Sequence, residues 1–101
     1  MGQHLSWASV LGAFRPIGSH SSGATVSTAI TLTPATGATK LLIQANTQNI
    51  RFTLDGSVPT TTAGFVLKAG DAPIIVNIEK GMTIKVIEAT ATADLEYQWG
   101  N

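Results

Sequence analysis

Cysteine is absent from the 101-residue chain, and charged residues are few. Without cysteine the protein can form no disulfide, no thiolate zinc site and no cysteine nucleophile. Charged residues make up 12% of the sequence, about half of the ~25% that is usual in soluble domains. A surface with so few charges does little to keep molecules apart. We therefore expect the protein to associate with itself or with a larger assembly.

Neither nucleic acid nor a membrane is an expected partner. Six basic residues balance six acidic ones and are scattered along the chain, so the dense basic stripe that phosphate binding needs is missing. Apolar runs are far shorter than the ~20 residues of a membrane span. Residues 1–4 lack the positive start of a secretory signal, and Arg15 would interrupt its apolar region. We expect a protein that is made and used without membrane export.

Alternating apolar residues predict β-strands along most of the chain. Leu41 and Ile43, for example, share one face, while Leu42 and Gln44 lie on the other. A period of two marks strands with one buried face. The pattern predicts strands at 40–45, 50–54, 65–68, 74–79, 84–87 and 95–99, with a further strand within 24–33. Strand signals at intervals of ~10 residues indicate an all-β fold, a single antiparallel β-sandwich or small barrel with an N-terminal extension.

The same pattern predicts the core and some of the turns. The apolar residues expected in the core are Ile43, Phe52, Leu54, Phe65, Leu67, Val76 and Val86. Three short segments separate consecutive strands closely enough to predict hairpins, namely 46–49, 69–73 and 79–81.

The N-terminal segment differs in character from the rest of the chain. Its apolar residues are candidates for contact with a partner, and they are Leu5, Trp7, Val10, Leu11 and Phe14. Gly18–Gly23 is rich in Gly and Ser, which is typical of a flexible hinge. We therefore divide the chain into an arm and hinge at 1–22 and an antiparallel β domain at 23–101. The arm would dock on a neighbouring subunit through Trp7, because aromatic anchors dominate interface energetics. The alternative is an edge element packed on the domain's own core.

Groups for catalysis or metal binding are sparse. His4 and His20 both lie in the arm and hinge, and neither has a carboxylate close in sequence. No nucleophile motif, paired-histidine motif or calcium loop is present. We expect no enzymatic activity, no metal and no cofactor.

Arg51–Thr60, with the sequence RFTLDGSVPT, is the most distinctive stretch. Physically it is a strand that enters a tight turn, in which Asp55 binds the backbone ahead and Gly56 allows a positive φ. Pro59 then prevents further ladder pairing. We interpret the motif residues as structural; they are Arg51, Asp55, Gly56, Pro59 and Gly64.

This stretch resembles a motif of small structural proteins in tailed-bacteriophage virions, in which the turn RFTLDGxxPT is followed by GFxLxxG. The second part is present here as Gly64–Gly70, and the resemblance covers residues 24–99. A shorter form of the motif also resembles turns in immunoglobulin-like accessory domains of carbohydrate-active enzymes.

The resemblance implies a virion structural protein, made in the host cytoplasm. The lack of a basic face favours the outside of the capsid, since packaged DNA would attract basic residues. We expect a decoration or cement protein that binds the major capsid protein or another virion protein as a homo-oligomer, with a trimer as the working guess. The alternatives are a tail or head-fibre component that contacts host glycans, for which Tyr97 and Trp99 are the candidate platform, and a carbohydrate-associated accessory module.

Overall fold

The computed structural model describes residues 14–101. Four of the five predicted arm residues, Leu5, Trp7, Val10 and Leu11, lie outside the described part of the chain, and only Phe14 lies within it. Residues 14–101 contain no helix that is long and apolar enough to span a bilayer.

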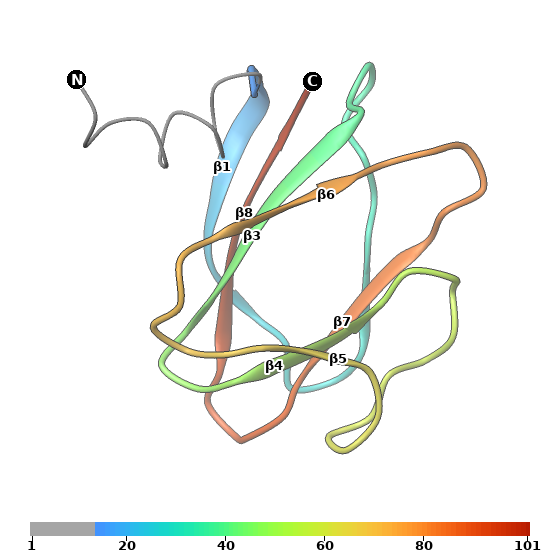
Figure 1. Cartoon of the computed structure of the whole chain (residues 1–101). Coiled ribbons are helices and arrows are strands. Elements are labelled where there is room, and N and C mark those ends of the chain that lie inside the picture. Colours follow the sequence, from blue (N-terminus) through green and yellow to red (C-terminus); the bar gives the residue numbers. More distant parts are fainter. Residues whose placement is uncertain (1–13) are drawn as a thin grey trace, which may run out of the picture.

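Eight strands make up the described structure (Figure 1). Their bounds are β1 Pro16–Thr25, β2 Ile30–Leu32, β3 Lys40–Asn46, β4 Ile50–Thr53, β5 Phe65–Leu67, β6 Ile74–Asn77, β7 Ile84–Glu88 and β8 Asp94–Gly100. They form two antiparallel four-stranded sheets, in the orders β1-β8-β3-β6 and β2-β7-β4-β5. The predicted all-β antiparallel sandwich is confirmed.

Most consecutive strands lie in different sheets. Only β4 and β5 are neighbours both in sequence and in a sheet; every other connection between described strands passes from one sheet to the other. This alternation, with the two strand orders given above, is the topology of an eight-stranded jelly roll.

The three predicted hairpins are therefore wrong. Residues 46–49 join β3 to β4, residues 69–73 lie between β5 and β6, and residues 79–81 lie between β6 and β7, and each pair is split between the sheets. Packed sheets are ~10 Å apart, which a few extended residues can span. A short turn in the sequence thus indicates a reversal without showing which sheet receives the next strand.

The core lies between the two sheets. Of the predicted core residues, Ile43, Phe52, Leu67 and Val86 are buried, and Leu54 and Val76 are partly buried against them. Phe65 was predicted to be buried, and this is wrong, because 64% of its surface is exposed. The physical reason is that Phe65 lies on β5, an edge strand of its sheet.

The predicted Gly/Ser hinge is also wrong. Gly18–Gly23 belongs to β1, which pairs with β8 from Pro16 opposite Gly100 to Thr25 opposite Asp94. The pairing shifts register twice, and both Gly18 and Gly23 have a positive φ. Glycine allows such bulges in an edge strand at low steric cost. The Gly- and Ser-rich composition that is typical of a linker belongs here to a bulged strand. The described β domain therefore begins before residue 23.

Phe14 and Arg15 continue this edge of the sheet. The backbone of Arg15 exchanges two hydrogen bonds with Asn101, of 2.8 and 2.9 Å. The ring of Phe14 occupies the place that a side chain on Gly100 would take. Phe14 therefore packs on its own domain at the end of β8.

Candidate functional site

The long loop between β4 and β5 is built by the RFTLDGSVPT motif. Arg51, on β4, donates from Nε to the carbonyl of Thr61 (3.2 Å) and from Nη1 to the carbonyl of Gly64 (2.9 Å). One guanidinium thus ties the returning half of the loop to the strand from which it departs. Within the loop, Pro59 is fully buried. The loop is held at several points along its length.

Asp55 and Gly56 fix the outgoing half of the loop. The backbone N–H of Ser57 donates to Oδ1 of Asp55 (3.0 Å), and this bond lowers the pKa of the carboxyl below its ordinary value. Gly56 has a φ of 87° and donates to the carbonyl of Thr83 (3.1 Å), while Thr83 donates to Leu54 (3.2 Å). These bonds join the loop to the segment before β7.

Gly64 brings the loop back against β4 at very close range. Its φ is 125°, and a Cβ at this position would lie 3.0 Å from the carbonyl oxygen of Phe52. Only glycine fits such an approach without strain. The five residues interpreted from the sequence as structural thus meet around one loop, and their combined effect is to set the position of Phe65, which follows Gly64 directly.

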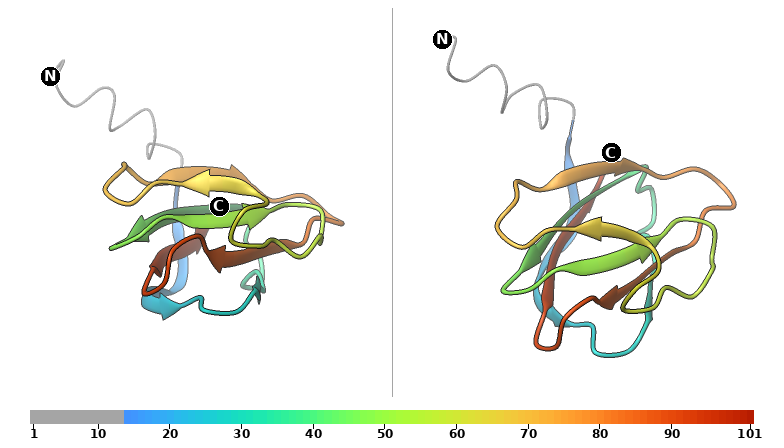
Figure 2. Two further views of the ribbon diagram at one scale, coloured as in Figure 1. Left: turned by 90° about the horizontal axis from the view of Figure 1, so that it is seen from below. Right: turned by 60° about the horizontal axis from the view of Figure 1, so that its bottom comes forward.

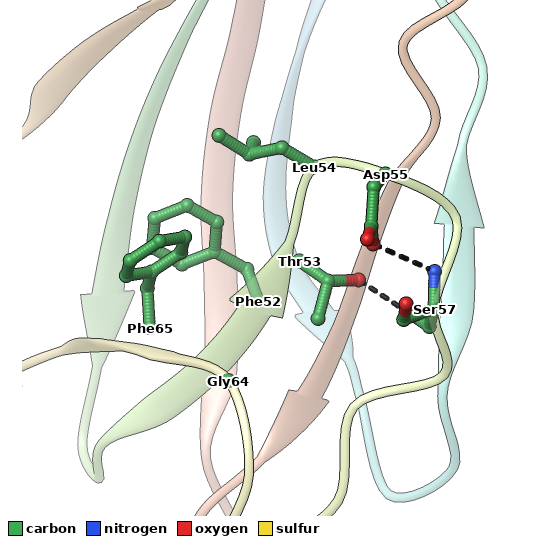
Figure 3. A pocket seen from close by; sticks show the side chains of 7 residues that line it. All are labelled: Phe52, Thr53, Leu54, Asp55, Ser57, Gly64 and Phe65. Atoms are coloured by element: carbon green, nitrogen blue, oxygen red, sulfur yellow. Dashed lines mark hydrogen bonds between the residues drawn. The ribbon is translucent and has the colours of Figure 1, made fainter.

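Phe65 faces the inside of the sandwich and is nevertheless exposed. It lies opposite Phe52 in the β4–β5 ladder, so both rings project from the same face, with centroids 5.5 Å apart (Figure 3). Phe52 is 6% exposed, whereas Phe65 is 64% exposed. Alternation correctly assigns Phe65 to the inner face. It does not show that the opposite sheet stops short of covering that face at the edge strand β5.

Ile74 repeats this situation on the other sheet. It lies opposite the buried Ile43 in the β3–β6 ladder, which places it on the inner face, yet 40% of its surface is exposed. β5 and β6 are the edge strands of their sheets and lie along the same side of the sandwich (Figure 2).

The two edges leave an open apolar groove between them, which we call the β5–β6 seam and define by Phe52, Phe65, Leu67, Ala72 and Ile74. A hollow of about 320 Å³ lies along it. A second hollow of about 480 Å³ adjoins it on the other side of the Phe52 and Phe65 rings, and Leu54 and Asp55 help to line it (Figure 3). The polar residues Gln44, Lys68 and Asp71 also line the hollow of about 320 Å³.

Apolar surface continues next to the seam. Val66 is exposed on the outer face of β5, and Val58 is exposed in the loop. Sequence reasoning missed this surface. A signal was available in the runs Phe65–Val66 and Ile74–Ile75, because two successive apolar residues in a strand must place one of them on the outer face.

A polar cluster on the opposite edge of the first sheet is the other candidate. Glu96, on β8, accepts hydrogen bonds from His20 Nε2 (2.7 Å), from the hydroxyl of Ser22 and from the backbone N–H of Gly23 (3.0 Å). The Ser22 and His20 bonds hold the pKa of Glu96 below its ordinary value. No carboxylate is close to His20 in the sequence, but the fold places Glu96 of β8 next to it. Ser22 and His20 both bind Glu96, so this hydroxyl donates to the carboxylate and not to the imidazole, unlike a Ser–His nucleophile pair.

The remaining predicted binding groups are enclosed. Trp99 is 7% exposed and belongs to the core, and Tyr97 is partly buried with its ring edge-on to that of Trp99, at 6.3 Å. They form no solvent-facing platform for a sugar. Among residues 14–101, no group of three or more His, Asp or Glu side chains could hold a metal ion.

Comparison of the chain with protein-family models, with curated proteins and with solved structures gives no significant match.

Proposed function

We propose that the chain is a non-enzymatic structural subunit of a tailed-bacteriophage virion, and specifically a decoration protein on the outer surface of the capsid. The observation that carries the proposal is the open β5–β6 seam. Phe65 and Ile74 project toward the core from opposite sheets and remain substantially exposed. Adjacent exposed apolar residues of this kind are typical of a surface that is covered in an assembly.

Three further features support a virion role. The jelly roll is a recurrent architecture of viral capsid proteins, although lectins and cupins share it and a fold alone does not fix a function. The RFTLDGSVPT stretch resembles the virion motif, and its residues build the loop beside the seam. The chain has no net charge, which suits the outside of a capsid better than contact with packaged DNA.

The mechanism of a decoration protein is mechanical. Each subunit would bridge adjacent copies of the major capsid protein, so that pulling them apart exposes apolar surface that is buried in the assembled shell. Burial of apolar surface contributes roughly 25 cal/mol per Å², and many copies over one capsid act together.

Purified virions of the phage that encodes the chain provide the test. We expect the protein in stoichiometric amounts beside the major capsid protein, with antibody-gold label on the outside of intact heads. Virions that lack the protein should lose DNA at a lower temperature than complete ones. Absence of the protein from purified virions, or label confined to the tail, would contradict the decoration role.

A further inference from the structure

We propose that the N-terminal segment of a second copy of the chain, residues 1–13, fills the β5–β6 seam. The contact would join one molecule to the next, head to tail. The inference concerns contact between copies of this chain and is independent of whether their assembly sits on a capsid.

The seam requires an apolar occupant. Its lining residues Phe65 and Ile74 belong to the inner faces of the two sheets, where their cross-strand neighbours Phe52 and Ile43 are buried. The two hollows beside the Phe52 and Phe65 rings offer room for large side chains. An inserted chain that carries apolar side chains would complete the core at this edge, as an added strand or helix does when it enters an apolar groove.

Residues 1–13 have the matching chemistry. They contain no Asp, Glu, Lys or Arg, and they include Leu5, Trp7, Val10 and Leu11. Insertion into the seam would therefore bury no charged side chain from the segment, apart from the titratable His4. Trp7 is the largest of these side chains and is the natural anchor.

The position where this segment joins the domain favours a second copy over the same chain. Phe14 and Arg15 lie at the end of β8 beside β1, whereas the seam borders β6, and β1 and β6 are the opposite edges of one sheet. The three strand spacings between them amount to about 14 Å. Length alone permits either route, because thirteen extended residues reach up to about 47 Å.

A route within one molecule would use part of the segment to cross the sheet. On the outer face of this sheet, polar side chains such as Gln44 and Glu96 lie beside the apolar Leu42 and Ile75. A neighbour whose β5–β6 edge lies beside this molecule's β1 edge receives the segment directly. Such a contact joins two different surfaces, so a linked pair keeps one free segment and one free seam, and a chain of copies closes into a ring when the rotation between copies allows.

Two single variants of the full-length chain test the exchange. Trp7→Ser leaves the seam intact but removes the anchor of the N-terminal segment. Phe65→Ser leaves the N-terminal segment intact but removes an aromatic ring from the seam. We expect the wild-type chain to sediment as an oligomer and each variant alone to sediment as a monomer. A 1:1 mixture of the variants should form heterodimers, because it contains one intact segment and one intact seam for each pair. Val58→Ser is the matched control, since Val58 is 63% exposed but lies outside the seam, and it should leave the wild-type mass unchanged.

Three results would overturn the proposal: a monomeric wild-type chain at all concentrations, variants that retain the wild-type mass, or a variant mixture that stays monomeric. Circular dichroism checks that each variant is folded. If Phe65→Ser does not fold, Ile74→Ser takes its place. Independently, the cysteine-free chain allows the pair Ala8→Cys and Ala72→Cys to be joined with a flexible bismaleimide. A ladder of linked chains is expected, whereas a link within one chain, or none, contradicts exchange between copies.

Discussion

The two outer edges of the β1-β8-β3-β6 sheet are finished in different ways. At the β1 edge the strand is bulged, and side chains from β8 bind it. Gln98 donates to the carbonyls of Ile17 (3.1 Å) and Gly18 (3.2 Å). Glu96 accepts from the side chains of His20 and Ser22 and from the backbone N–H of Gly23. At the β6 edge the pairing is regular, and the side chains of residues 74–76 are apolar.

The difference follows the requirements of an edge strand. Exposed edges invite pairing with other chains, and bulges that turn the backbone away are a common protection. The β1 edge has this protection, and its freed carbonyls are satisfied within the domain. The β5–β6 edge lacks it and exposes inner-face residues as well. We infer that the first edge is built to remain closed and the second to be covered.

Of the changes considered, removal of β1 should lower the free energy of unfolding the most. A chain that lacks residues 2–22 loses most of β1, one of the two strands that pair with β8. We expect its free energy of unfolding to fall by at least ~3 kcal/mol, a large part of the ~5–15 kcal/mol of a small domain. A chain that lacks only residues 2–13 keeps every described strand and should lose little. Urea unfolding of both, monitored by circular dichroism at a concentration where the chains are monomeric, measures the difference. Equal stability of the two truncated chains would show that β1 is dispensable.

The same substitution, Phe→Ala, at the cross-strand neighbours Phe52 and Phe65 compares the loss of a buried ring with the loss of an exposed ring. Phe52→Ala opens a cavity in the core and should destabilise the monomer by about 3–5 kcal/mol. Phe65→Ala removes a ring that is already mostly in water, and we expect a loss of about 1 kcal/mol or less, since exposed substitutions have small effects. Denaturant midpoints of the two variants check this. A Phe65→Ala loss as large as that of Phe52→Ala would mean that the seam is closed within the monomer.

Acid should act on the β1 edge through Glu96, with a smaller effect. The folded protein holds the pKa of Glu96 below its ordinary value of 4.5, mainly through the Ser22 and His20 hydrogen bonds. A depressed carboxyl pKa adds stability above the unfolded value, and this contribution is lost as the pH falls through the folded value. Stability should therefore decline below about pH 4.5, and Glu96→Gln should reduce this decline. Thermal unfolding between pH 3 and pH 7 measures it, and an unchanged pH profile in Glu96→Gln would contradict the role of this carboxylate.

The sequence predicts the strands better than their partners. Alternation depends only on local burial, so it locates β3, β4, β7 and β8 well and identifies the inner faces. The choice of sheet depends on long-range pairing, and for this reason three turns that resemble hairpins prove to cross between sheets. Gly18–Gly23 has the composition of a linker because bulges need the same residues.

The candidate site shows the same limit. The turn motif was visible in the sequence, and its residues do build one loop. The exposure of Phe65 was not visible, because it depends on where the opposing sheet ends. Periodicity reports which face a side chain occupies and not what covers that face.

Acrylamide quenching of tryptophan fluorescence in the full-length chain is the most direct measurement of whether a neighbour covers the seam. The chain has two tryptophans, and Trp99 is buried, so a change in quenching reports on Trp7. The account predicts that the quenchable fraction falls as the protein concentration rises, and that it stays high at every concentration in Phe65→Ser. Quenching that is independent of concentration in the wild-type chain, whether Trp7 is always accessible or always protected, would contradict it.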